Sequence, residues 1–177
     1  LLEPAATTDP LRVALLVGVN HYQKRGLAEK PLRYAERDVD ELAAELREHQ
    51  FVVRTLKGDE ATKTRIESAL EATCKGRNAT DIVLIGFSGH GQQHPLTDSQ
   101  GKVITDASGE PQEDAFYCPV DAERGNPTTL LSLTNLVRTL DRKGGINLIL
   151  VDACRDNPEA TGGGKSISGN ELNGRLP

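Results

Sequence analysis

The sequence predicts an α/β domain built as a three-layer αβα sandwich, with helices on both faces of a mainly parallel sheet. Continuous apolar runs, which mark strands covered on both faces, alternate with segments whose apolar residues recur at helical spacing. Strands connected through helices cross over in a right-handed sense and run parallel. The length of 177 residues suffices for one domain with a substantial core.

Three strands and two helices are expected in the first half of the chain. Residues 12–19 (RVALLVGV) form a continuous apolar run, and residues 51–56 and 81–87 are two further apolar strands. Residues 34–49 and 62–74 carry apolar residues at helical spacing, with charged residues on the opposite face. The second of these helices begins with a threonine, which is a favoured N-cap residue.

The second half opens on a polar stretch at residues 92–113, which predicts a long loop containing a short hairpin. Residues 115–119 follow as a short extended piece. Leucine and valine at helical spacing predict a third helix over residues 132–142, which ends at the two glycines of residues 144–145. Residues 146–151 are the fourth strand.

The chain divides into three parts. Residues 1–11 read as a loose leader, residues 12–156 as the folded domain, and residues 157–177 as a Gly/Ser-rich, mobile segment. Methionine is absent, and the first residues lack the basic and apolar regions of a signal peptide. We therefore expect a fragment or a processed chain.

Composition excludes several classes of protein. The net charge of −5 argues against a nucleic-acid partner, and no run approaches the roughly 20 apolar residues needed to span a membrane. Three cysteines without a CxxC pair argue against a disulfide framework and against zinc. They favour a reducing compartment, and we expect a cytoplasmic protein.

The strongest chemical signal is a cysteine and a histidine that follow two buried strands. Cys154 comes after the fourth strand, within DACRD, and His90 after the third, within SGHG. Because ligands bind at the carboxyl ends of parallel strands, the two side chains are expected to meet there and to form a nucleophile and its base. The glycines beside His90 let the chain turn sharply. The alternatives are a buried structural cysteine and a simple Gly-His-Gly turn.

Further residues complete a candidate site. The backbone N–H groups of Gly91 and Cys154 could form an oxyanion hole. Asp38, Ser88 and Asp152 could line a polar pocket whose carboxylates suit a guanidinium or ammonium group. For Asp38, stabilisation of the helix dipole is an equally good interpretation. The remaining cysteines and histidines lack such a context: these are Cys74, Cys118, His21, His49 and His94.

Six segments, in order, resemble the large-subunit portion of a caspase-like cysteine peptidase. They are RVALLVGVNHY, LRYAERDVDELAAELRE, DIVLIGFSGHG, FYCPVDA, LLSLTNLVRTL and INLILVDACRDNP. The chain is most similar to the metacaspase and paracaspase branch as found in prokaryotes, the orthocaspases. The resemblance implies a caspase-like fold and a dyad of Cys154 and His90 that cleaves peptide bonds through a thioester.

The resemblance also implies a specificity. Caspases have Gln two residues before the catalytic Cys and cut after Asp, whereas this chain has Asp152, as metacaspases do. Asp152 would then form, with Asp38 and Ser88, an acidic pocket that selects Arg or Lys before the scissile bond. The family often has Asn where this chain has Arg37.

Maturation and cofactors follow from the same resemblance. Relatives often activate themselves by cutting the linker after a basic residue, for which Lys165 and Arg175 are the candidates, and the partner would be a small-subunit segment. The chemistry needs no cofactor. Several metacaspases require calcium, for which Asp106, Glu113 and Asp114 are loosely placed candidates. The alternatives are a catalytically silent caspase-like binding or signalling module and a flavodoxin-like domain, which the missing phosphate loop disfavours.

Overall fold

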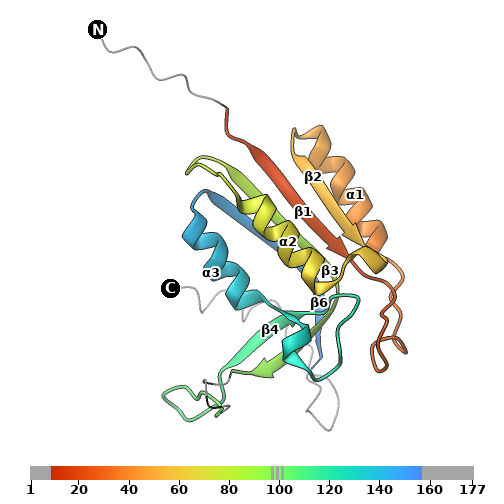
Figure 1. Ribbon diagram of the computed structural model, residues 1–177, viewed down its shortest axis with the longest axis vertical. Helices are drawn as coiled ribbons and strands as arrows, with labels where there is room; N and C mark the ends of the chain where they lie inside the picture. The colour runs from red at the N-terminus through yellow and green to blue at the C-terminus, as the bar shows by residue number, and fades with distance from the viewer. Residues whose placement is uncertain (1–8, 97, 99, 101, 157–177) are drawn as a thin grey trace.

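A six-stranded sheet lies between two layers of helices. The computed structural model describes residues 9–96, 98, 100 and 102–156, with Lys143 and residues 154–156 described by backbone alone. Helix α1 covers one face of the sheet, and α2 and α3 cover the other (Figure 1). The expected three-layer αβα sandwich with a mainly parallel sheet is therefore confirmed.

The elements follow the predicted order. They are β1 (Arg12–Gly18), α1 (Ala35–Glu48), β2 (Val52–Lys57), the 3-10 helix η1 (Gly58–Glu60), α2 (Lys63–Cys74), β3 (Ile82–Pro95), β4 (Glu113–Tyr117), the 3-10 helix η2 (Pro127–Thr129), β5 (Leu131–Ser132), α3 (Leu133–Lys143) and β6 (Ile146–Asp156). Most of the leader and the whole segment 157–177 lie outside the described residues. In the part of the chain that the structure describes, no helix is both long and apolar enough to cross a membrane.

The long strand β3 organises the sheet. Strand β1 pairs in parallel with its first half and with β2, and β6 pairs in parallel with β3 as far as Gln92. The distal part of β3, from Gly91 to Pro95, pairs with β4 in antiparallel orientation, and β4 pairs with β5. The β3 segment that contains His90 is therefore held by neighbouring backbone on both edges.

Alternating side chains of the central strands fill two cores. Leu15 and Val17 of β1 face α2 and α3, and Ala14 and Leu16 face α1. All four are at most 1% exposed, which explains why this strand reads as a continuous apolar run rather than as an alternating one. The hydrophobic effect on both faces fixes the sheet that carries the site.

Local capping confirms the predicted helix ends. The Thr62 side chain accepts a hydrogen bond from the Arg65 N–H at the start of α2, at 3.4 Å. At the start of α3, Ser132 Oγ accepts from the Asn135 N–H at 3.0 Å. Gly144, with φ of +72°, ends that helix in a conformation that favours glycine.

Two sequence-based expectations were wrong. The chain does not turn at Ser88–Gly91, because β3 continues to Pro95, paired with β6 as far as Gln92 and with β4 from Gly91 onward. His94 consequently lies inside a strand and not in a polar loop. Residues 96–112 connect β3 to β4, and there the Ile104 N–H donates to Leu96 O at 2.8 Å within the expected hairpin.

Candidate active site

His90 and Cys154 are paired positions on adjacent strands. The parallel register of β3 and β6 runs from Ile82 opposite Ile146 to Gln92 opposite Asp156, and it sets His90 opposite Cys154. Neighbouring strands are about 4.8 Å apart. The two residues are therefore brought together by strand register within the sheet, and not by loops beyond its strand ends.

The ring of His90 is oriented by a backbone carbonyl. His90 is buried, and its Nε2 lies 2.7 Å from Lys30 O, in the loop between β1 and α1. Because a carbonyl oxygen only accepts hydrogen bonds, Nε2 must carry the hydrogen. In the neutral ring, Nδ1 is then the nitrogen with a free lone pair. This bond therefore selects the tautomer in which Nδ1 is the basic nitrogen.

Tyr22 holds the backbone of the same histidine. The His90 N–H donates to Tyr22 Oη at 2.7 Å, and the two ring centroids are 5.0 Å apart. Tyr22 is 5% exposed, and burial raises the pKa of its phenol well above the ordinary value, although the bond from His90 lowers that pKa in part. Tyr22 therefore stays neutral and serves as a fixed acceptor.

Packing around Gly89 explains the glycine before His90. A Cβ at this position would lie 2.8 Å from Tyr22 Oη and 3.1 Å from the Tyr117 ring, and the φ angle is +156°. Tyr117 in turn donates from its hydroxyl to Ser88 O at 3.1 Å. Glycine is required here for the close approach of two tyrosines and not for a sharp turn.

Replacing Tyr22 with Phe is expected to lower about tenfold the kcat of the His90–Cys154 peptidase activity that the sequence predicts, with little change in KM. The substitution leaves the buried His90 N–H without its acceptor, at a cost of about 1–3 kcal/mol, and loosens the ring. Steady-state kinetics and thermal unfolding measure the two effects. Tyr34→Phe is the matched control, because Tyr34 is 60% exposed. An equal loss in both variants, or a change confined to KM, would contradict a positioning role for Tyr22.

Two of the three candidate pocket residues are neighbours in the sheet. Ser88 is paired with Gly18 of β1 on one side and with Asp152 of β6 on the other. Asp38 lies in the first turn of α1. A Cβ on Gly18 would be 2.7 Å from Ala35 O, so the start of α1 abuts the carboxyl end of β1. All three residues thus lie near the carboxyl ends of the parallel strands, with Asp38 and Asp152 exposed and Ser88 buried.

A comparison with known families assigns the chain to one of them. A model of the caspase domain (peptidase C14) matches residues 11–173. The chain belongs to the caspase-domain family. In the structure, His90 and Cys154 are the histidine and cysteine that the strand register pairs.

A solved structure shares the caspase-like fold. Protein GSU0716 from Geobacter sulfurreducens is similar to this chain at 25% sequence identity and a TM-score of 0.63, over 84% of this chain and 52% of that one. The chain therefore spans about half the length of the solved structure that it matches. A search of curated proteins gave no match.

The other cysteines of this caspase domain are buried in the fold. Cys118 is fully buried, its Sγ accepts from Gln92 Nε2 at 3.4 Å, and its N–H donates to His90 O at 2.9 Å. Cys74 is also buried, at the end of α2. Both cysteines are therefore part of the packed interior, at positions for which the sequence indicates no catalytic context.

The other histidines lie away from the dyad positions or are engaged elsewhere. His94 Nε2 lies 3.1 Å from Gln92 Oε1, inside β3. The exposed His49 lies 3.1 Å from Glu45 Oε1, and His21 is exposed.

The three calcium candidates are engaged within the fold. Asp114 is buried and accepts from Thr134 Oγ1 at 2.7 Å, which anchors the start of α3. Asp106 Oδ1 accepts from the Ser108 N–H at 2.9 Å, and Glu113 accepts from Gln93 Nε2. Within the described ranges, no three His, Cys, Asp or Glu side chains gather as a metal-binding group. The cleavage candidates Lys165 and Arg175 lie outside the described residues.

Sequence reasoning missed the groups that orient His90. The Lys30 carbonyl belongs to the backbone and leaves no side-chain pattern. Tyr22 and Tyr117 did lie in two of the segments quoted above, RVALLVGVNHY and FYCPVDA, but nothing in their spacing showed that they pack beside Gly89.

Proposed function

We propose that this protein is a cysteine endopeptidase of the metacaspase and orthocaspase branch, which cleaves peptide bonds after Arg or Lys. The observation that carries the proposal is the register that sets His90 opposite Cys154. The hydrogen bond from His90 Nε2 to Lys30 O adds the reason why this histidine can serve as the base.

The proposed reaction runs through a thioester. His90 Nδ1 takes the proton of the Cys154 thiol, and the sulfur attacks the carbonyl carbon of the scissile bond. The backbone N–H groups of Gly91 and Cys154 stabilise the oxyanion. As the C–N bond breaks, His90 returns the proton to the leaving amine. Water, deprotonated by the same ring, then cleaves the thioester and regenerates the thiol.

The proposed specificity rests on the acidic residues that lie near His90 and Cys154, at the carboxyl ends of the parallel strands. Asp152 and Asp38 supply two carboxylates, and Ser88 supplies a hydroxyl between β1 and β6. A guanidinium or ammonium group is the natural partner for such a pocket, since charge-assisted hydrogen bonds to carboxylates are the stronger class. We propose that this pocket binds the residue before the scissile bond.

An apolar face of β6 supports a small-subunit partner. Ile146, Leu148 and Leu150 are 52%, 45% and 47% exposed, and every pairing described for β6 is with β3. Alternate apolar residues left exposed on a strand predict a covering layer. We propose that a later segment of the same protein covers them, after self-cleavage at Lys165 or Arg175 in the linker of residues 157–177, in the cytoplasm.

A peptidyl-Arg chloromethyl ketone is expected to add once to the full-length protein, with loss of chloride and alkylation of Cys154. Intact-mass and peptide-mapping spectra measure the adduct. Cys154→Ala should stay unlabelled, and the peptidyl-Asp reagent should label the wild type far more slowly. Labelling at Cys74 or Cys118, or no labelling at all, would favour the silent binding module. Running the reaction with and without added calcium tests calcium dependence.

A further inference from the structure

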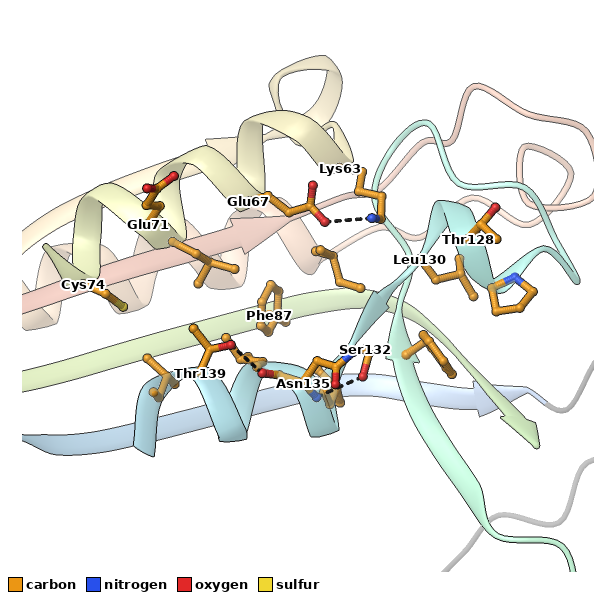
Figure 2. A pocket seen from close by; sticks show the side chains of 17 residues that line it. Lys63, Glu67, Glu71, Cys74, Phe87, Thr128, Leu130, Ser132, Asn135 and Thr139 are labelled. Carbon is orange, nitrogen blue, oxygen red and sulfur yellow. Dashed lines mark hydrogen bonds and ion pairs between the residues drawn. The ribbon is translucent and has the colours of Figure 1, made fainter. Parts of the chain in front are cut away.

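A cavity lies on the opposite side of the sheet from α1. It has a volume of about 530 Å³ and lies between α2 and α3, above the middle of the sheet. Figure 2 shows Phe87 of β3 between the two helices, with α2 on one side and α3 on the other. None of the residues proposed for catalysis lines it.

The interior of the cavity is apolar. Phe87, Leu136 and Leu140 are buried, and Leu70 is half-buried, so their side chains form a hydrocarbon floor. Its volume falls in the range of about 300–1,000 Å³ that is typical of small-molecule sites. An apolar group of one or two rings is a suitable occupant.

Charge is confined to the α2 rim. Lys63, Glu67 and Glu71 are four residues apart and therefore form one row along the helix. The Lys63 ammonium is engaged by Glu67 Oε1 at 2.7 Å (Figure 2). Glu71 is exposed and has no ion-pair partner among the described residues, so the rim carries one uncompensated negative charge.

The α3 rim of the cavity is uncharged, and the cation of Arg77 lies outside the lining. The α3 rim offers the uncharged side chains of Asn135 and Thr139, and Thr139 Oγ1 donates to Asn135 O at 2.8 Å. The guanidinium of Arg77, beyond the end of α2, does not line the cavity, and it interacts with Cys74 and with the carboxylate of Asp81.

We propose that this cavity is a regulatory site for a small cationic amphiphile, an aromatic or aliphatic body that carries one amine. The body would displace water from the floor around Phe87 and Leu136. The amine would lie against Glu71. An anionic molecule of the same shape is disfavoured by the same carboxylate, and a neutral one gains only the apolar contacts.

The floor of the cavity contacts the support of His90. The ring centroids of Phe87 and Tyr117 are 4.6 Å apart, and the Tyr117 hydroxyl donates a hydrogen bond to Ser88 O. Ser88 and Gly89 lead directly to His90, and the position of Gly89 is set by Tyr117 and Tyr22. A ligand that shifts Phe87 would therefore act on Tyr117, and through Tyr117 on the backbone that carries His90. Binding of the ligand does not depend on the proposed peptidase activity, whereas regulation of cleavage by the ligand rests on that proposed function.

Tryptamine is the probe, with tryptophol as its uncharged isostere and indole-3-propionate as its anionic counterpart. The 177-residue chain contains no Trp, so with this chain indole fluorescence anisotropy reports the probe alone. We expect the 177-residue chain to bind tryptamine about two- to fivefold more tightly than tryptophol, the usual gain from one exposed charge pair. Indole-3-propionate should bind more weakly than both. Glu71→Gln should abolish the preference for the amine.

Two matched variants on α3 locate the binding site. Thr139→Phe fills the mouth of the cavity and should weaken tryptamine binding at least tenfold, whereas Arg138→Phe, at the exposed neighbour outside the lining, should not. Saturating tryptamine should also shift the NMR signals of the His90 ring in the wild type but not in Thr139→Phe. Equal affinity for the three probes, equal binding by both variants, or an unmoved His90 signal would overturn the proposal. Self-association that Thr139→Phe abolishes, without probe binding, would assign the groove to a second copy instead.

Discussion

His90→Ala is expected to lower kcat for an Arg-containing reporter peptide by about 10²–10⁴-fold, the usual contribution of a general base. The free lone pair on Nδ1 exists because Nε2 donates to Lys30 O at 2.7 Å, and alanine removes both. KM should change little, because substrate selection is proposed to depend on the acidic pocket. Stopped-flow or plate-reader kinetics at saturating peptide measure the loss.

Two controls separate chemistry from folding in this experiment. His49→Ala removes an exposed imidazole at the end of α1 and should leave kcat unchanged. Thermal unfolding of His90→Ala should show a folded protein, since the Tyr22 contact to the His90 backbone N–H does not need the imidazole. A folded His90→Ala variant with wild-type kcat would remove the histidine from the mechanism and, with it, the dyad.

Cys154→Ala provides the second half of the same test. If the two residues act as one unit, the double variant should be no slower than either single variant, because removing either partner already abolishes nucleophile activation. Additive losses would indicate that His90 and Cys154 act independently, which the paired register makes unexpected.

The sequence was sufficient where burial alone decides structure. Strand β1 was predicted within one residue because core packing on both faces leaves no polar position between Val13 and Val17. Helix α2 was predicted within one residue for a local reason, the Thr62 side chain that accepts from the Arg65 N–H. Such signals lie within a few residues of the element that they define.

The sequence was insufficient where distant segments satisfy polar groups. The second half of β3 reads as a polar loop, yet Gln92 is buried because Cys118 accepts from its amide nitrogen and the Gly125 N–H donates to its oxygen. These partners are 26 and 33 residues away, so no local pattern indicates a strand. The Lys30 carbonyl, 60 residues from His90, was out of reach for the same reason.

The positions of His90 and Cys154 were expected to meet for a reason that the structure modifies. Sequence reasoning placed both residues beyond strand ends, where chemistry gathers in open α/β sheets. In the structure both strands continue past these residues, to Pro95 and Asp156. His90 and Cys154 are therefore close because the two strands pair in register, and not because loops beyond the strand ends meet. That register depends on the pairing of complete strands.

Asp152→Asn is expected to lower kcat/KM for an Arg reporter by about 10–100-fold while leaving an uncharged reporter nearly unaffected. Losing one charge-assisted hydrogen bond to a guanidinium costs about 1.5–3 kcal/mol. Asparagine keeps the shape of the side chain, and Asp152 is exposed, so stability should change by no more than about 0.5 kcal/mol. The ratio of the two kcat/KM values is the quantity to measure.

The choice between Asp152 and Asp38 as the main anion follows from their placement. Asp152 lies on β6 two residues before Cys154, a step of roughly 6.6 Å along a strand, and it is paired with Ser88. Asp38 belongs to α1, and its carboxylate also stabilises the start of that helix. Asp38→Asn should therefore lower the Arg preference less than Asp152→Asn, and Asp141→Asn on α3 should not lower it at all. A larger effect at Asp38 would move the centre of the pocket from the strand to the helix.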